Sequence, residues 1–453
     1  MVTEQIDLDD VRAALTGAGR GRQRERAREA LRRLPPEDAV ELLQELPPSE
    51  LAGLVAVLGD EALAELLAEV DAATAARLIV RLGRAQAADV LEEMAPDDAT
   101  DVVEEMADAE AEAILVEMEV ADAAAIRDLL AYPPDTAGGR MTPEFVALSP
   151  DVTVDEALVA LRAVAAEAET IYYAYVTDAD GRLLGVLNLR DLVTARPGTS
   201  VGQVMVADPV RARADADQEV AARLLAERGF LALPVVDDED RLLGIVTADD
   251  AFAVLEEEFS EDYLRLAGTD AEEMARRTPL QVARMRLPWL LGTMAIELGA
   301  GLVIANFDDV LKQVILLASF MPVISAVSGN VGLQAAAIVV RGLDTGHVRL
   351  KDWGQQVGRE LGTALLMALA CGAVLGTVGA VWSRHVPFGL VIGGAMTCSM
   401  LTAGLMGTVI PMLSKRLGFD PAATAGPFET AFQDVVGFAV FLWLAAQLLQ
   451  WLR

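Results

Sequence analysis

The C-terminal part of the chain contains five long apolar stretches separated by polar segments. A helix that crosses a bilayer takes about 20 mostly apolar residues, and each stretch reaches that length. The pattern therefore predicts five membrane-spanning helices, at Leu287–Phe307, Leu311–Val340, Leu361–Trp382, Phe388–Leu413 and Pro427–Leu449.

The second stretch is longer than one straight span needs. Its 30 residues would form a helix of about 45 Å, whereas the hydrocarbon core of a bilayer is about 30 Å thick. Pro322 lacks an amide hydrogen, and Ser328–Gly329–Asn330 interrupts the apolar pattern. We expect a kink or break at one of these two places.

The segments between the apolar stretches predict how the chain lies in the membrane. Basic residues gather between the second and third stretches and between the fourth and fifth: Arg341, Arg349, Lys351, Arg359, Lys415 and Arg416. Basic loops face the cytoplasm, so we expect the N-terminus inside the cell and the C-terminus outside. The first residues, MVTEQIDLDD, have no apolar core and do not resemble a signal peptide, which agrees with that orientation.

The first 132 residues show a different pattern, in which short helical segments follow one another. A proline with acidic neighbours recurs in Leu34-Pro-Pro-Glu-Asp-Ala39 and in Met94-Ala-Pro-Asp-Asp-Ala99. Proline fits the first turn of a helix, and acidic residues there complement the helix dipole. We therefore expect a stack of short helices, in which most of these acids are simply first-turn residues.

Between these two regions the chain repeats itself. Residues 176–193 (VTDADGRLLGVLNLRDLV) and 235–252 (VVDDEDRLLGIVTADDAF) match at an offset of 59 residues. Each copy has apolar strands around an acidic turn, and a helical stretch precedes each, at Val154–Ala166 and Gln218–Arg228. The repeat predicts two α/β domains of one fold.

The overall charge narrows the class of partner. The chain has 36 Lys and Arg residues against 69 Asp and Glu residues, a net charge of −33. Nucleic-acid binding needs basic side chains that neutralise phosphates, so this excess favours cationic partners instead. Residues 286–453 hold ten basic and nine acidic side chains, so the acidic excess lies before the membrane helices.

One acidic cluster lies directly before the first apolar stretch, within residues 256–285. Glu258, Glu261 and Asp262 are spaced so that they share one face of a helix. Like charges so placed repel each other, and either solvent ions screen them or they bind cations. The sequence favours neither alternative.

Acidic residues also occur inside the apolar stretches. Asp434 lies seven residues inside the fifth stretch, where a carboxylate is costly unless it meets water, a partner or an ion. Thr430 lies one turn earlier on the same face, whereas Glu429 is off that face and is expected nearer the interface. Glu297 in the first stretch is a second candidate. These acids either mark an ion pathway or form structural hydrogen bonds to neighbouring helices.

The available ligand types restrict the ion. Asn330 and Gln334 add two neutral oxygens, four residues apart in the second stretch. The two cysteines lie in apolar stretches and the two histidines in or near loops, which argues against a disulfide framework and a Cys or His zinc site. Oxygen ligands alone favour a hard divalent cation.

Five helices form a thin wall for a pore, so we expect a homodimer with the pore at its two-fold axis. Small residues in the fourth stretch are explained by close helix packing: Gly389, Gly393, Gly394, Ala395, Gly404 and Gly407.

Taken together, the chain resembles the MgtE family of magnesium transporters and channels. The resemblance rests on the order of the regions and on three stretches: Tyr132–Met141 (YPPDTAGGRM), Phe320–Gln334 (FMPVISAVSGNVGLQ) and Gly418–Gly437. The repeat resembles a tandem pair of CBS (cystathionine-β-synthase-type) domains. The resemblance implies a multidomain membrane protein with an all-α superhelical N domain, α/β tandem CBS domains, a connecting (plug) helix and a five-helix all-α transmembrane domain.

The resemblance also implies domain bounds. We expect an acidic helical N domain at 1–132, CBS domains at 133–200 and 201–259, the connecting helix at 260–285 and the transmembrane pore domain at 286–453.

Site residues follow from the same resemblance. Asp434 would select hydrated Mg²⁺, with Thr430, Gly426 and Asn330 lining the path and Asp308 near the outer mouth. The regulatory metal sites would use Asp97, Asp101, Asp217, Glu219, Asp250, Glu258, Glu261 and Asp262.

The second CBS copy matches the family's nucleotide pattern at Gly244–Asp250. Thr247 and Asp250 would accordingly bind ATP or another adenine nucleotide. The first copy has Asn188 in place of the threonine, and Gly229 stands where an acid of the family would be, so the number of regulatory ions stays open.

The implied function is magnesium uptake in the cell membrane through a channel or transporter. Mg²⁺ would move down its electrochemical gradient, which supplies about 4.6 kcal/mol per 100 mV for a divalent ion. Cytosolic Mg²⁺ bound between the acidic surfaces would close the pore. The sequence shows no G-x-x-x-x-G-K-[ST] loop and no nucleophile–base set, so we expect neither a pump nor an enzyme.

Two alternatives stay open. One is a divalent cation exporter or exchanger that uses the same acids, and the other is a nucleotide-sensing CBS membrane regulator.

Overall fold

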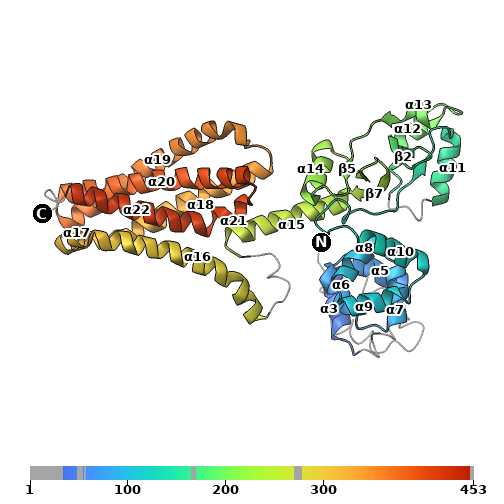
Figure 1. Cartoon of the computed structure of the whole chain (residues 1–453), viewed down its shortest axis with the longest axis horizontal. Helices are drawn as coiled ribbons and strands as arrows, with labels where there is room; N and C mark the ends of the chain where they lie inside the picture. The colour runs from blue at the N-terminus through green and yellow to red at the C-terminus, as the bar shows by residue number, and fades with distance from the viewer. Residues whose placement is uncertain are drawn as a thin grey trace, which may run out of the picture. The chain divides into compact units, whose positions relative to one another are not determined.

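The computed structural model describes residues 34–47, 51, 55, 58–164, 170–269 and 278–448. The chain divides into two compact units, Met1–Glu256 and Glu257–Arg453. The first runs from blue to yellow-green in Figure 1, and the second continues to red. Each unit has apolar cores of its own, so each holds its own candidate site residues in place.

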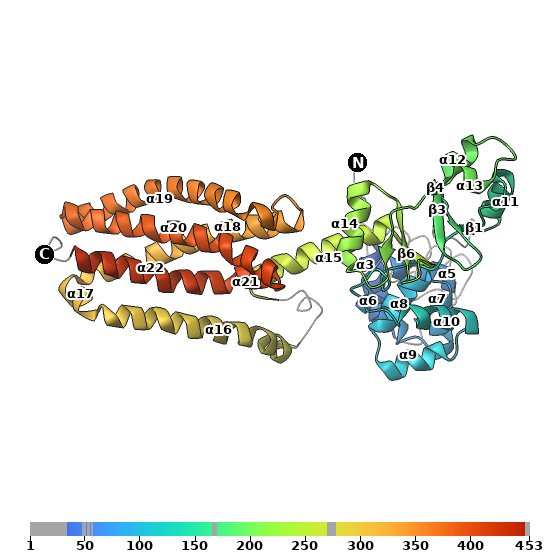
Figure 2. The same cartoon turned by 45° about the horizontal axis from the view of Figure 1, so that its top comes forward.

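The first unit begins with short helices packed around one apolar core, which confirms the predicted stack (Figures 1 and 2). They are α3 (Pro36–Glu45), α5 (Asp60–Ala68), α6 (Ala72–Ile79), α7 (Arg84–Glu92), α8 (Pro96–Glu104), α9 (Asp108–Leu115) and α10 (Val120–Leu129). In α8 a proline stands in the first turn together with Asp97 and Asp98, as the recurring motif predicts.

Two small sheets follow in the same unit. The first has the order β1 (Ala147–Leu148), β2 (Tyr173–Thr177), β3 (Leu183–Asn188) and β4 (Val206–Ala207), and the second has β5 (Ala212–Arg213), β6 (Ala232–Val236) and β7 (Leu242–Thr247). In each sheet the first pair is parallel and the next is antiparallel. The helices of these domains are α11 (Val154–Val164), α12 (Leu189–Thr194), α13 (Val201–Val204) and α14 (Gln218–Arg228).

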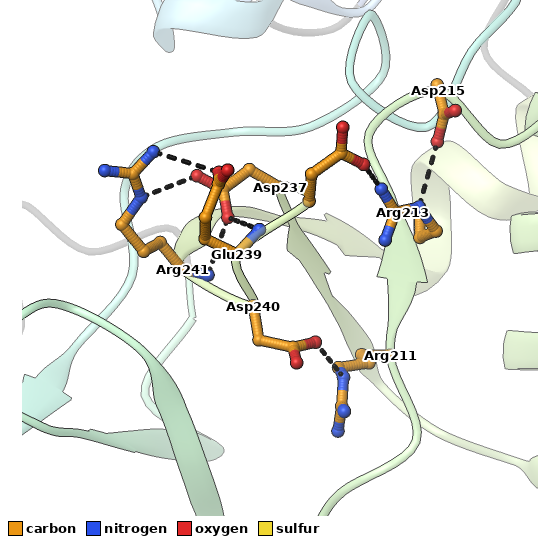
Figure 3. Close-up of polar contacts among 8 residues, drawn as sticks. Arg211, Arg213, Asp215, Asp237, Glu239, Asp240 and Arg241 are labelled. Atoms are coloured by element: carbon orange, nitrogen blue, oxygen red, sulfur yellow. Dashed lines mark hydrogen bonds and ion pairs between the residues drawn. The ribbon is translucent and has the colours of Figure 1, made fainter.

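The structure confirms the internal repeat, because β6 and β7 follow β2 and β3 at the predicted offset. The acidic turn of the second copy is drawn in Figure 3. Oδ1 of Asp237 accepts hydrogen bonds from the backbone amides of Glu239 (2.9 Å) and Arg241 (2.8 Å), and Asp178 accepts the equivalent pair in the first copy. Burial opposes ionisation of Asp237, but these bonds and the Arg241 guanidinium hold its pKa below the usual value.

One helix leads out of the second repeat. This helix, α15 (Ala248–Leu266), begins directly after β7 and runs past the boundary between the two units. The next helix, α16, begins at Pro279, and residues 270–277 lie outside the described part. The connecting helix that we expect at 260–285 thus corresponds to the end of α15 and the first turns of α16.

The second unit contains five helical segments that are long and apolar enough to cross a membrane, as predicted. They comprise α16 (Pro279–Asn306), η2 (Ile315–Ser319) with α18 (Met321–Asp344), η3 (Leu350–Asp352) with α19 (Trp353–Ser383), α20 (Val386–Leu417), and α21 (Pro421–Ala425) with α22 (Pro427–Gln447). The short helix α17 (Asp308–Gln313) joins the first two. Both views show α18, α20 and α22 packed side by side (Figures 1 and 2).

The second span breaks at only one of the two expected places. A 3₁₀ segment ends at Ser319, and Pro322 stands in the first turn of α18, where its missing amide hydrogen costs nothing. The helix does not break at the other place, Ser328–Gly329–Asn330, because α18 runs through these residues. Gly329 instead lets α18 approach the side chain of Thr430 on α22, so this glycine serves helix packing.

Candidate cation sites

The main candidate site lies between α16, α18 and α22. Both carboxylate oxygens of Asp434 accept a hydrogen bond from Ser325 Oγ, at 2.7 and 2.8 Å, and Asp434 is half-buried. The side chain of Glu297 on α16 also lies close to Asp434 and interacts with it. The two acids that the sequence singles out in separate spans therefore meet, whereas the sequence analysis missed Ser325.

The other predicted pore residues have different surroundings. Thr430, Asn330 and Gln334 are exposed on the described chain, with Thr430 one turn before Asp434. Gly426 is buried at the start of α22, and a Cβ there would overlap the backbone carbonyl of Leu266 on α15. Glycine is thus the residue that lets α15 approach the base of α22.

Asp308 lies in α17, the short helix that joins the first two spans. It forms an ion pair with Lys312 one turn later, and its hydrogen bond raises the pKa of Lys312. Both side chains are largely exposed. Any cation that binds Asp308 therefore has to compete with this lysine.

Glu429 differs from the expectation. We expected it nearer the interface, but it is fully buried, at 0 % exposure. Neither of its carboxylate oxygens has a hydrogen-bond partner in the described structure. The reason is that α21 directly precedes α22, so Glu429 does not stand at the end of the span.

In the first unit, α8 brings several acids to one place. Asp97 is half-buried in its first turn, and Asp101 pairs with Arg140 at 3.3 Å. Glu104 lies one turn after Asp101, and its pKa is raised by burial and then by the charge of Asp101. Arg140 partly balances this group, and it also donates a hydrogen bond to Gln218 at 2.9 Å.

Two of the predicted regulatory acids have structural partners on α14. Asp217 is the N-cap residue, and its side chain accepts a hydrogen bond from the backbone amide of Glu219 at 2.8 Å. The Glu219 side chain pairs with Arg223, one turn later. These contacts account for both residues without a bound metal ion.

The predicted nucleotide residues do come together at the end of β7. Thr247 is buried, and its hydroxyl donates a hydrogen bond to Asp250 in the first turn of α15. Burial raises the pKa of Asp250 more than this hydrogen bond lowers it. Asp250 is thus an acid whose folded environment favours a proton or a bound cation.

The acidic face of α15 also carries a basic neighbour. Glu261 pairs with Arg265 on the next turn, and Arg265 also binds Asp420, the N-cap of α21, at 2.7 Å. The guanidinium of Arg341, in the last turns of α18, lies 5.0 Å from the ring centroid of Phe259. The end of α15 is therefore attached to α18 and α21, while Glu258 and Asp262 are half-buried on the same helix.

Within the described ranges, no group of three or more His, Cys, Asp or Glu residues is arranged to hold a metal ion. Any cation at these places must therefore complete its coordination with neutral oxygens or water.

Comparison with known proteins divides the chain into the same regions. Family models match as the MgtE intracellular N domain at 25–135, CBS domains at 137–198 and 201–257, and the MgtE divalent cation transporter at 321–444. A solved structure of the soluble part of a magnesium transporter is 31% identical, with a TM-score of 0.50, and covers 56% of this chain and 99% of that chain.

Relatives that align over most of the chain show the same family. The magnesium transporter MgtE of Thermus thermophilus is 40% identical over 328 residues, and that of Enterococcus faecalis is 37% identical over 326 residues. Each alignment covers 72% of this chain and 72% of the relative. The chain thus belongs to the MgtE family of divalent cation transporters.

Proposed function

We propose that this chain carries Mg²⁺ into the cell through its transmembrane helices, down the electrochemical gradient. One observation carries the proposal: two carboxyl groups from different spans, Glu297 and Asp434, meet inside the helices. The partners of Asp434 in the described structure are this acid and the Ser325 hydroxyl, and neither is basic. The names of its relatives, magnesium transporters, support the same ion.

The chemistry of the carboxyl pair suits a hydrated divalent ion. Two carboxyl groups this close repel each other as carboxylates unless they share a proton. A cation between Glu297 and Asp434 would replace that proton, and two negative charges would balance one divalent ion. Mg²⁺ releases its waters reluctantly and usually binds one or two carboxylates, so Ser325 and Thr430 would contact its water shell.

We extend the proposal to the orientation of the chain in the membrane and to its oligomeric state. We propose that the chain lies in the cell membrane with its N-terminus in the cytoplasm, because basic residues follow α18 and occupy the last turn of α20. We also propose a homodimer, because Thr430 and Asn330 are exposed on a single chain. A second copy would enclose them around a common path.

Regulation would act through α15. Its end is attached to α21 by Arg265 and Asp420 and packs against the base of α22 at Gly426. Mg²⁺ bound by Glu258, Glu261 and Asp262 would neutralise this face and release Arg265 from Glu261 for Asp420. High cytosolic Mg²⁺ would thus hold α15 against α22 and close the path.

A nucleotide would bind at the second CBS domain. The hydrogen-bonded pair of Thr247 and Asp250 offers a hydroxyl and a carboxylate, the groups that hold a ribose. An adenine nucleotide there would be a regulator, and its binding would not require Asp434.

The test uses full-length protein in liposomes loaded with a magnesium indicator. Na⁺ concentration and pH are kept equal on both sides, and a K⁺ gradient with an ionophore sets an inside-negative potential. We expect Mg²⁺ uptake that increases with this potential. Uptake that needs an opposing Na⁺ or proton gradient would make the protein an exchanger, and nucleotide binding without flux would make it a regulator.

A further inference from the structure

Glu429 stands apart from the acids of the proposed ion path. It is 0 % exposed, and both carboxylate oxygens lack a hydrogen-bond partner in the described structure. Its carboxyl group lies so close to Gly332 on α18 that a Cβ at that glycine would overlap it. Asp434, by contrast, is only half-buried and accepts two hydrogen bonds from Ser325.

Two further polar side chains share this property. Gln433, one turn after Glu429 on α22, is 0 % exposed, and its amide nitrogen donates to Ser399 Oγ on α20 at 3.2 Å. Its Oε1 atom is left without a donor and lies toward Gly329 on α18. Ser328 is also 0 % exposed, and its Oγ atom has no partner within the described ranges.

The packing of α18 on α22 brings Gln433 and Glu429 against the helix that carries Ser328. Ser325 meets Asp434, Gly329 meets Gln433, and Gly332 meets Glu429. Ser328 shares a helix face with Gly332, since they are four residues apart. Along α18, Ser328 thus lies between Ser325 and Gly332, and its side chain is buried.

Three buried side chains whose oxygens lack a hydrogen-bond partner in the described structure are unusual. Buried polar groups are nearly always hydrogen-bonded, and a buried charge without a partner is strongly unfavourable inside a membrane domain. Each of these unpartnered atoms is an oxygen that can accept, and a cation can bind several such oxygens at once.

We propose that Glu429, Gln433 and Ser328 form a second cation site, which takes a small monovalent cation such as Na⁺ with little or no water. One carboxylate balances one positive charge, whereas a divalent ion would keep an uncompensated charge in a dry site. Mg²⁺ is further disfavoured because it retains its waters.

The site uses other ligands than the proposed magnesium path and does not require that path. Glu429 and Gln433 are buried, whereas Thr430 is exposed on the single chain, although it also lies beside Gly329. A filled site would neutralise Glu429 and hold α18, α20 and α22 together.

Direct binding of radioactive Na⁺ to the full-length protein tests the proposal. Binding is measured at equilibrium in detergent, at constant ionic strength with N-methylglucamine as the replacing cation. We expect saturable Na⁺ binding in the unchanged protein and in Asp434→Asn, and its loss in Glu429→Gln. Glu360→Gln, a matched change on α19, should bind as the unchanged protein does.

A milder variant guards against misfolding. Ser328→Ala removes one neutral ligand, and we expect its half-saturating Na⁺ concentration to rise by about tenfold, the low end of the losses seen when a metal site loses a supporting group. Absence of saturable Na⁺ binding in the unchanged protein overturns the proposal. So does binding that survives Glu429→Gln, or binding that Asp434→Asn abolishes.

Discussion

Several acidic side chains in the first unit pair with arginines, whereas Asp434 and Glu429 among the transmembrane helices have no basic partner in the described structure. Asp101 pairs with Arg140, and the acids of the turn in Figure 3 pair with arginines in the same way. Asp434 instead has Ser325 and Glu297. A surface acid paired with arginine needs no further ion, but a buried acid without a base needs a proton or a metal cation.

The acids at the end of α15 are intermediate between these two kinds of acid. Glu261 has a basic partner in Arg265, but Arg265 is shared with Asp420. A cation at Glu261 can therefore redistribute this arginine, whereas a cation at Asp434 has only a proton to displace. This difference underlies our proposal that the buried acids carry transport and the shared ones control it.

The largest effect is expected for Asp434. Replacing it with Ala or Asn removes the charge that holds the ion, and a charged contact of about 3 kcal/mol corresponds to roughly a hundredfold loss. Mg²⁺ uptake into proteoliposomes measures this loss. Asp352→Asn, an exposed aspartate before α19, is the matched control, and normal uptake by both variants would remove Asp434 from the path.

Asp250→Asn tests the nucleotide site. Loss of the charged partner of the ribose should weaken adenine-nucleotide binding by about tenfold to a hundredfold, as measured by titration calorimetry. Asp249→Asn, the exposed neighbour, should bind normally. Unchanged affinity in Asp250→Asn would show that nucleotide, if bound, lies elsewhere.

The Asp250→Asn variant should also change how the stability of the protein depends on pH. Burial raises the pKa of Asp250 in the folded chain, so its stabilising contribution is complete below the unfolded pKa of about 3.9 and is lost as the pH rises through the folded value. Without divalent ions, Asp250→Asn should therefore be more stable than the unchanged protein at pH 7 and equal to it near pH 4. Thermal unfolding in a chelator measures both, and the opposite pH trend would refute the assignment.

Neutralising Glu258, Glu261 and Asp262 together should weaken closure by Mg²⁺. Couplings of 1–3 kcal/mol correspond to roughly five- to 150-fold, so the internal Mg²⁺ that halves the current should rise by about tenfold. Patch-clamp recording with varied internal Mg²⁺ gives this value. A triple variant that closes at the usual Mg²⁺ concentration would separate α15 from control.

Glu297→Gln should have a smaller effect than loss of Asp434. It removes one charge of the pair but keeps a hydrogen-bonding group beside Asp434, so we expect about a fivefold loss of uptake, which corresponds to about 1 kcal/mol. The same proteoliposome assay serves here. A loss as large as that of Asp434→Ala would mean that the two acids act as one unit, and no loss would mean that Glu297 is structural.

The smallest effect is expected at Asp217. As an N-cap, it should cost about 1 kcal/mol of stability when replaced by Ala, and almost nothing when replaced by Asn, which also caps. Asp217→Asn should leave the Mg²⁺ dependence of closure unchanged. If this variant weakens closure although it keeps the cap, Asp217 binds a regulatory ion after all.

Features that depend on nearby residues could be predicted from the sequence. The five spans, the short N-terminal helices and the repeat all follow from apolar periodicity and turn residues within a few tens of positions. Asp434 and Glu297 are recognisable for the same reason, since a charge inside an apolar stretch is a local signal.

Features that depend on packing between helices could not be predicted from the sequence. Ser325 joins Asp434 across 109 residues of sequence, and no local pattern marks a serine in an apolar helix as a partner. The polar segment Ser328–Asn330 suggests a break, but glycines there allow α18 to pack on α22. Glu429 was misplaced because α21 cannot be recognised from hydrophobicity alone.

The most direct test of the central claim is the position of the ion. Full-length protein crystallised with Mn²⁺ in place of Mg²⁺ would reveal bound ions by anomalous scattering. The account predicts a peak near Asp434, about 4–5 Å from its carboxylate for an ion that keeps its water shell. Peaks at α15 and in the first unit, with none at Asp434 in a Mn²⁺-saturated crystal, would contradict it.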